Sequence, residues 1–302
     1  MILNNIKAFF LSIILFFTGL LSGVPADTYD PGSFTQIEAD TQQDGTVRIM
    51  SFNVRCTTVN GVPMRKRHDL VCGEILKVAP TSVGTQEVTP EWRKVLGEKL
   101  GDTYGMVGLG RDGGQKGEHS LILYNLEKTE LLNSGTFWLS ETPDEVSMDW
   151  GAAFRRICTW AELKIKETGE VYVHVNCHLD HISSLARENG VKLILSFIEE
   201  NYADMPVVFT GDFNSQPDSE AYQSVAASGM RDSRLTAKEI TAYGTWHDGN
   251  PVLMGDGVYL DYVFVNDLVE PLVYKTLTTG IDNRFVSDHF PIYADVRLGQ
   301  SK

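Results

Sequence analysis

Apolar and polar residues alternate over residues 47–53, and this period of two is typical of a strand with one buried face. Over residues 67–78 the apolar residues instead recur at helical spacing. Pro90 favours the start of a second helix, which we expect to run to about residue 100. A third helix is predicted over residues 184–202, with its apolar residues on one face.

Strands account for most of the remaining pattern. They are predicted at residues 81–85, 120–124, 129–139, 158–165, 171–179, 207–210, 260–265 and 291–296. Strands that dominate, with helices after only some of them, are typical of two packed sheets with helices outside. We therefore predict an α/β fold: a four-layer α/β sandwich in which two packed, mostly antiparallel β-sheets are flanked by helices.

The pattern ahead of residue 47 is different. Residues 1–26 are predicted to be a signal peptide, because residues 8–21 form an apolar run that is shorter than the roughly 20 residues of a membrane span. Small residues around Ala26 suit cleavage there, and an uncleaved anchor is the alternative. The protein is therefore expected to be exported, to the periplasm or the extracellular space, with no stable membrane insertion after cleavage.

The rest of the chain divides into two parts. Residues 27–46 are polar and are expected to form a flexible lead-in. Residues 47–302 contain no internal repeat and no linker, so we expect one catalytic domain. A monomer is expected.

Composition excludes some functions. The chain has 26 Lys and Arg against 40 Asp and Glu, a formal net charge of −14. A protein that grips long nucleic acid non-specifically needs clustered positive charge, and no extended basic groove with interleaved aromatic residues is evident. The four cysteines are too few for a disulfide scaffold. Cys158 and Cys177 fall in strand-like runs, and both a bridge and buried free thiols remain open.

Polar side chains recur where the predicted strands begin or end. They are Asn53, Gln86, Glu87, His178, Asp180, His181, Asp212, Asn214, Asp261, Asp288 and His289. A rigid sheet can hold such residues in fixed geometry, so the pattern indicates a site. Carboxylates, amides and imidazoles together are what metal-assisted hydrolysis of a phosphate ester needs.

Six segments in order carry a resemblance to a known family. They are residues 51–55, 85–88, 176–181, 211–215, 260–265 and 287–291. Together they resemble the endonuclease/exonuclease/phosphatase superfamily, which includes deoxyribonuclease-like nucleases, neutral sphingomyelinases and inositol polyphosphate phosphatases. Residues 137–143, 155–161 and 245–247 resemble an exported bacterial subgroup of it.

The residue types and the resemblance agree on a metal site. Glu87 is a hard oxygen ligand suited to Mg²⁺, which prefers one or two carboxylates together with water and substrate phosphate. Asn53 and Asp288 are the expected supporting ligands, directly or through water. The predicted cofactor is therefore Mg²⁺, with Mn²⁺ as a substitute.

His289 is the predicted general base that takes a proton from the attacking water. The resemblance implies that Asp261 holds the other ring nitrogen of His289. Asp212 and Asn214 are expected to orient the nucleophile and to hold the non-bridging oxygens. Which group is the true base stays open.

The resemblance implies that His178 donates to the phosphate or to the leaving oxygen. In the deoxyribonuclease branch a glutamate partners the equivalent histidine, and the sequence around residues 109–124 points to Glu118 for that position.

Five further residues are candidates for substrate contacts: Arg156, Asp180, His181, Trp246 and His247. Arg156 is suited to bidentate binding of a phosphate. Trp246 and His247 are suited either to stacking on a sugar, base or head group or to covering the core, and a surface role for His181 is equally open. The predicted partner is a phosphate-ester substrate, and the predicted function is metal-dependent hydrolysis of a phosphodiester. A phosphomonoesterase acting on a phosphorylated sugar or inositol is the alternative, and a non-catalytic binding domain is a remote one.

Overall fold

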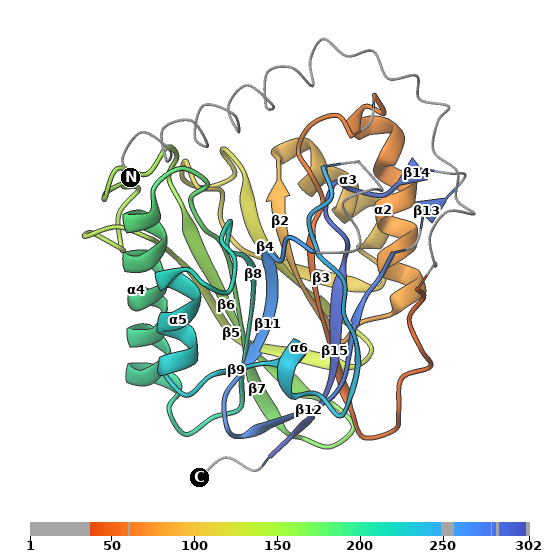
Figure 1. Ribbon diagram of the computed structural model, residues 1–302. Coiled ribbons are helices and arrows are strands. Elements are labelled where there is room, and N and C mark those ends of the chain that lie inside the picture. Colours follow the sequence, from red (N-terminus) through yellow and green to blue (C-terminus); the bar gives the residue numbers. More distant parts are fainter. Residues whose placement is uncertain (1–36, 60, 249–256, 279, 282–283, 300–302) are drawn as a thin grey trace.

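Two β-sheets pack face to face, and helices cover both outer faces (Figure 1). The computed structural model describes residues 37–59, 61–248, 257–278, 280–281 and 284–299. The predicted signal peptide and the first residues of the lead-in, up to residue 36, lie outside the described residues. The four-layer α/β sandwich predicted from the sequence is confirmed.

The first sheet has seven strands. Their spatial order is β10 (Glu239–Thr241), β12 (Val269–Thr276), β15 (Ile292–Leu298), β1 (Val47–Asn53), β2 (Ser82–Val88), β4 (His119–Asn125) and β3 (Tyr104–Val107). The second sheet has six strands. Their order is β5 (Thr129–Trp138), β6 (Ile157–Ile165), β7 (Val171–His178), β8 (Val207–Asp212), β11 (Asp261–Val265) and β9 (Arg231–Asp232). Strands β13 (Gly280–Ile281) and β14 (Arg284–Phe285) pair antiparallel with each other.

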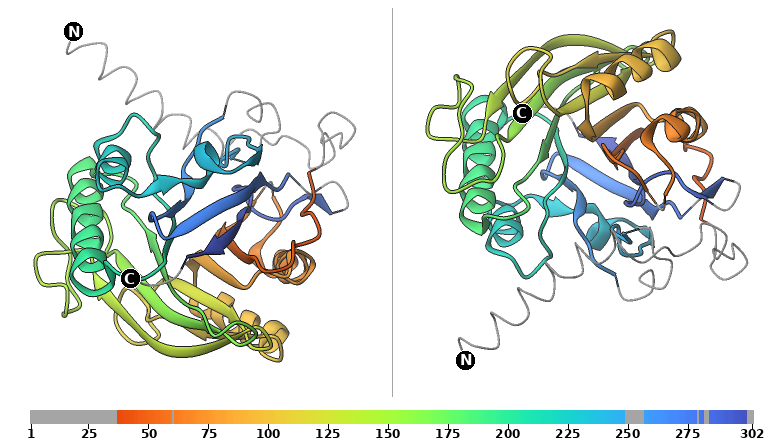
Figure 2. Two further views of the ribbon diagram at one scale, coloured as in Figure 1. Left: turned by 90° about the horizontal axis from the view of Figure 1, so that it is seen from below. Right: turned by 90° about the horizontal axis from the view of Figure 1, so that it is seen from above.

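Helices α2 (Met64–Val78) and α3 (Pro90–Leu100) lie on the first sheet, and α4 (Ser184–Tyr202) and α5 (Glu220–Ala227) lie on the second. A short helix, α6 (Ser233–Thr236), contacts β11 and β12. Viewed from below or above, the two helix layers stand on opposite sides with both sheets between them (Figure 2). Within the described residues, no helix combines the length and the apolar character that a membrane span requires.

The core has three parts. One apolar cluster lies between the two sheets, and it includes Ile49, Ile122, Val208 and Val263, all fully buried. The other two clusters join each sheet to its own helix layer. Because both faces of each sheet are buried, the central strands β1, β2 and β8 are buried along their whole length.

The end of the lead-in is tied to the first sheet. The backbone N–H of Ile37 donates to Thr278 Oγ1 at 2.9 Å, and the N–H of Asp40 donates to the hydroxyl of Tyr293 at 3.1 Å. Lys275 forms an ion pair with Asp40 at 2.6 Å. The part of the lead-in that the structure describes is therefore anchored rather than a free tail.

Cys158 and Cys177 are paired residues on the neighbouring strands β6 and β7. Both are free thiols and both are fully buried. Burial raises the pKa of each thiol well above its usual value, so both stay protonated and unreactive. Of the two alternatives left open by the sequence, the structure contains buried free thiols.

Candidate active site

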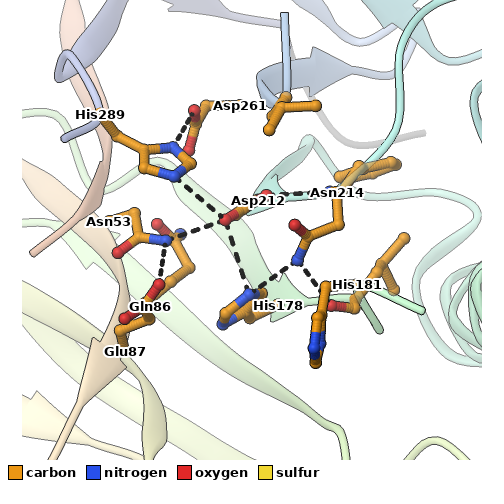
Figure 3. Close-up of polar contacts among 12 residues, drawn as sticks. Asn53, Gln86, Glu87, His178, His181, Asp212, Asn214, Asp261 and His289 are labelled. Atoms are coloured by element: carbon orange, nitrogen blue, oxygen red, sulfur yellow. Dashed lines mark hydrogen bonds and ion pairs between the residues drawn. The ribbon is translucent and has the colours of Figure 1, made fainter. Parts of the chain in front are cut away.

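The directions of the central strands bring the polar strand ends together. Strands β1 and β2 run parallel in the first sheet, and β7 and β8 run parallel in the second. Their carboxyl ends carry Asn53 and Glu87 on one side and His178 and Asp212 on the other. Because the two sheets pack face to face, these four residues meet at one edge of the sandwich (Figure 3).

Two antiparallel neighbours complete the group from the opposite direction. Strand β11 runs antiparallel to β8, so its first residue, Asp261, lies opposite Asp212. Strand β15 runs antiparallel to β1, and the loop just before it carries Asp288 and His289. These seven residues, all singled out in the sequence analysis, therefore come from strand ends or adjacent loops at this edge.

Asp261, His289 and Asp212 form a buried chain. Nδ1 of His289 donates to Oδ2 of Asp261 at 2.8 Å, and its Nε2 lies 3.8 Å from Oδ2 of Asp212. All three side chains are almost inaccessible to solvent. The Asp261 contact fixes the tautomer of the imidazole and turns Nε2 toward Asp212.

The electrostatics of this chain raise the pKa of both His289 and Asp212. Burial by itself lowers the pKa of His289, but the charges of Asp261 and Asp212 outweigh it and raise this pKa to about 10. Burial, with the charge of Asp261 beside it, raises the pKa of Asp212 to about 7 although His289 opposes the shift. His289 is therefore stabilised as an imidazolium, and Asp212 is the carboxylate that can take up a proton near neutral pH.

His178 is held on the other side of Asp212. Nδ2 of Asn214 donates to Nε2 of His178 at 2.9 Å and to the carbonyl of Leu179 at 3.0 Å, which fixes the orientation of the amide. Burial, together with the charge of Arg156, holds the pKa of His178 well below its usual value. His178 is thus a neutral imidazole whose Nε2 accepts and whose proton resides on Nδ1.

A second cluster of oxygen atoms lies beside this chain. Nδ2 of Asn53 donates to Oε1 of Glu87 at 3.1 Å and to Oδ2 of Asp212 at 2.8 Å. Oε2 of Glu87 accepts from the backbone N–H of Cys56 at 2.9 Å. Burial alone would raise the pKa of Glu87, but the charge of Arg55 and the Cys56 hydrogen bond hold it well below its usual range.

The donor chemistry of this cluster suits a hard divalent cation. Glu87 and Asp288 offer buried carboxylates, and Asn53 adds an amide oxygen. Another group, Asp212, Asp261 and His289, has ligand atoms within 4.8 Å of one another. In that group Nδ1 of His289 is already hydrogen-bonded to Asp261, so the Glu87 cluster is the better fit for a divalent cation.

A pocket of about 600 Å³ opens onto both clusters. Its lining includes every catalytic and metal-site residue named above except Asn53 and Asp261, which lie just behind. It also contains residues to which the sequence analysis assigned no role: Arg55, Arg111, Phe154, Arg187, Ser215, Gln216, Asp218, Ser219, Asp248, Val258 and Leu260.

Glu118 lies at the pocket but has a different partner from the one expected. Its carboxylate forms a two-point contact with the guanidinium of Arg111, at 2.9 and 3.1 Å. The guanidinium of Arg111 also lies 4.5 Å from the ring centroid of Phe154. His178 instead has Asn214 as its close partner, so Glu118 is positioned to orient Arg111 rather than His178.

Three of the expected substrate residues line the pocket: Arg156, His181 and Trp246. Nη2 of Arg156 lies 3.1 Å from Nδ1 of His181, whose ring stacks on Phe154 with 5.7 Å between centroids. Arg156, His181 and Phe154 together form one wall of the pocket.

Asp180 and His247 do not face the pocket. The two carboxylate oxygens of Asp180 accept backbone N–H groups at the start of α4 and in the loop before Arg156, so this residue positions its neighbours. His247 packs between Phe285 and Phe290, with centroid separations of 4.4 and 4.2 Å. Burial lowers the pKa of His247 to about 3, so it is a neutral core residue.

The model of the endonuclease/exonuclease/phosphatase family matches residues 50–289. A family member from Bacteroides vulgatus is 35% identical, with a TM-score of 0.79, over 84% of this chain and 99% of that one. A mannosyl-6-phosphatase from Bacteroides thetaiotaomicron is 30% identical, with a TM-score of 0.77, over 83% of this chain and 99% of that one.

More distant structures share the fold. The catalytic domain of human nocturnin is 18% identical, with a TM-score of 0.67, over 91% of this chain and 98% of that one. A comparison with curated proteins gives no match. The motifs occur in the order expected for the family, they meet at the strand-end site, and the family model matches most of the chain. This chain therefore belongs to the endonuclease/exonuclease/phosphatase family.

Proposed function

We propose that this protein is a divalent-metal-dependent hydrolase of phosphoric esters. One observation carries the proposal: the buried Asp261–His289–Asp212 chain and the Glu87–Asn53 oxygen cluster share a single pocket and are linked by the hydrogen bond from Asn53 to Asp212. A proton-accepting chain beside a hard-cation site is the arrangement that attack of water on phosphorus requires.

The chain's own residues supply the proton transfer. The oxygen of a water attacks phosphorus while the ester P–O bond breaks, and the proton of the water passes to Asp212, whose Oδ2 lies 3.8 Å from Nε2 of the His289 imidazolium. Asp261 holds that imidazolium in place. Asn214 keeps the His178 ring oriented, and His178 with Arg156 presents polar groups to the phosphoryl oxygens and to the leaving oxygen.

The metal would be held by Glu87, Asn53 and Asp288. When bound, a divalent cation neutralises charge on the phosphate and on the leaving oxygen. The buried carboxylate of Glu87, whose pKa is held well below the usual range, is ionised and available as a ligand at neutral pH.

The ester class is proposed on the shape of the pocket. The pocket has a volume of about 600 Å³, and Arg156, His181 and Phe154 line one side of it. A space of this size suits a compact molecule better than a polymer. Similarity to the mannosyl-6-phosphatase supports a phosphorylated sugar, and thus a monoester. A phosphodiester, the class first expected from the sequence, is the second candidate because the same proton chain would serve it.

An assay panel tests the function. The full chain is incubated with p-nitrophenyl phosphate, its bis-ester, mannose 6-phosphate, plasmid DNA and RNA, each with Mg²⁺, Mn²⁺ or EDTA. We expect release of phosphate from the monoesters with either metal and none in EDTA. Full activity in EDTA, or no turnover of any ester, would overturn the proposal, and preferential cleavage of the bis-ester would select the diesterase.

We also propose export and a monomeric state. Export is supported by the apolar run of residues 8–21 and by the small residues before Asp27. Amino-terminal sequencing of the protein recovered outside the cytoplasm should then begin at Asp27. Sedimentation equilibrium should give the mass of one chain, and a larger mass would contradict the monomer.

A further inference from the structure

An arginine lies inside the carboxylate cluster. Nη1 of Arg55 is 3.5 Å from Oε1 of Glu87, and its Nε is 3.3 Å from Oδ2 of Asp288. These are two of the three residues proposed to hold the metal. The Arg55 side chain is 28% exposed and lines the same pocket as the two carboxylates, so it adjoins the space for substrate.

The backbone fixes Arg55 in this place. Its φ of +55° is in the left-handed region, which costs free energy for a residue with a side chain. Its N–H donates to Oδ1 of Asn53 at 2.9 Å. Its carbonyl accepts from Nη2 of Arg67 at 2.7 Å and from Nε1 of Trp92 at 3.1 Å. Three hydrogen bonds therefore enforce a conformation that the residue would otherwise avoid.

The two carboxylates need a compensating charge. Glu87 is 7% exposed and Asp288 4%, and buried anions are costly unless a cation lies beside them. Arg55 supplies that cation. The effect is mutual: burial alone would lower the pKa of Arg55, but the charges of Asp288 and Glu87 raise it.

We propose that Arg55 is a resident counter-charge that competes with the divalent cation for Glu87 and Asp288. The inference rests on the metal site in the proposed function. The lone pairs that face the guanidinium are those a metal would use, and two cations cannot both occupy them. Because the Arg55 backbone is fixed, only its side chain can yield, and it yields toward the pocket, where an anionic phosphate can replace the carboxylates as its partner.

Two consequences follow for binding. The charge of Arg55 weakens binding of the metal alone. Inorganic phosphate strengthens it, because the displaced guanidinium gains a partner, and by reciprocity the metal strengthens binding of phosphate. Arg55 therefore makes occupancy of the metal site depend on the substrate group.

The test is calorimetric titration of Mn²⁺ into metal-free full chain, with and without inorganic phosphate. Arg55→Met removes the charge and keeps much of the length, and Arg55→Lys keeps the charge. Arg155→Met is the matched control for net charge, because Arg155 is 43% exposed and pairs with Asp112 at 3.0 Å outside the metal cluster. Thermal unfolding in EDTA accompanies each titration.

We expect Arg55→Met to bind Mn²⁺ alone about tenfold more tightly than the unchanged protein, since a full positive charge has left the ligands. Its melting temperature in EDTA should fall and should recover with Mn²⁺, and the effect of phosphate on Mn²⁺ affinity should be lost. Arg55→Lys and Arg155→Met should stay within about twofold of the unchanged protein.

Equal or weaker Mn²⁺ binding by Arg55→Met would overturn the competition while leaving the metal site intact. An equal gain in Arg155→Met would overturn it as well, because net charge would then explain the gain. If Mn²⁺ bound to none of the four proteins, the metal site of the proposed function would itself fall.

Discussion

Asp212 and Asp261 lie directly opposite each other on the antiparallel strands β8 and β11. Two buried carboxylates at such a position repel each other unless a proton or a cation lies between them. His289 fills that role, with Nδ1 at 2.8 Å from Asp261 and Nε2 at 3.8 Å from Asp212. The strand register thus places two carboxylates where they repel each other. The imidazole of His289 relieves this repulsion and links the two carboxylates into a proton-accepting chain.

The first prediction concerns this chain as one unit. His289→Ala should lower kcat by about 10²–10⁴-fold, the usual contribution of a general acid–base group. Asp261→Asn should also cost heavily, since the amide can present a donor to Nδ1 and reverse the tautomer. The double variant should be little worse than His289→Ala alone, because the two residues act together. Steady-state kinetics of the three variants checks this, and fully multiplicative losses would contradict it.

A second prediction concerns pH and stability without metal. The carboxylates raise the pKa of His289 from 6.5 to about 10. Between these values the folded protein keeps a proton that the unfolded chain has lost, so the free energy of unfolding falls as pH rises. Below pH 6.5 the contribution is fully present. In EDTA, the stability lost in His289→Ala should be larger at about pH 6 than at about pH 9.

Urea unfolding at the two pH values measures that difference. Cys and Tyr side chains also ionise in the unfolded chain above about pH 8.5, but they do so in both proteins and cancel in the comparison. A stability difference that grows with pH would show that the folded protein holds His289 neutral.

The main strands and helices could be predicted because their patterns are local. Every predicted strand and helix is present, with ends shifted by a few residues. Strand β12 was missed because Pro271 breaks its pattern, and the structure accommodates this proline at a β-bulge between residues 271 and 273. Strand β3 and helix α5 were missed because they are short and lack a sustained period.

The sequence predicted the site residues that lie at strand ends. It did not predict the pocket residues that come from loops. Arg111 and Phe154 come from loops with no periodic pattern. Trp138 fixes the first loop by donating from Nε1 to the Arg111 carbonyl at 2.7 Å. The sequence also did not indicate that the neighbouring side chains of Trp246 and His247 point in opposite directions. Successive residues of an extended segment point to opposite sides, so Trp246 lines the pocket and His247 enters the core.

A third prediction concerns the metal. Glu87→Gln keeps the size of the side chain but removes the charge that binds a divalent cation. Activity with saturating Mg²⁺ should fall by at least about 100-fold, and the rise in melting temperature on adding Mn²⁺ should be lost. Glu141→Gln, which changes an exposed glutamate in the loop after β5, is the control and should keep both properties. An active Glu87→Gln protein that Mn²⁺ still stabilises would refute the assignment.

Behind the site, the two sheets approach closely at Gly84. A Cβ added there would overlap Oγ1 of Thr210 and lie 2.5 Å from Oδ1 of Asn176. Those two side chains are hydrogen-bonded to each other at 3.1 Å, and Nδ2 of Asn176 donates to the carbonyls of Thr85 and Leu121. Gln86 donates to Oδ1 of Asn176 at 2.8 Å. This buried polar layer sets the spacing between the sheets beneath the catalytic residues.

The last prediction is that Gly84→Ala destabilises the protein by about 1–3 kcal/mol, because the added methyl group overpacks a layer that cannot shift without breaking hydrogen bonds. Gly73→Ala is the matched control. Gly73 lies inside α2, and a Cβ there would meet nothing within 4 Å, so alanine should stabilise the helix by about 0.5–1 kcal/mol. Urea unfolding of both variants measures the change in the free energy of unfolding, which should be a loss for Gly84→Ala and a gain for Gly73→Ala. If Gly84→Ala were as stable as the unchanged protein, the polar layer would be free to adjust and would not set the spacing of the sheets.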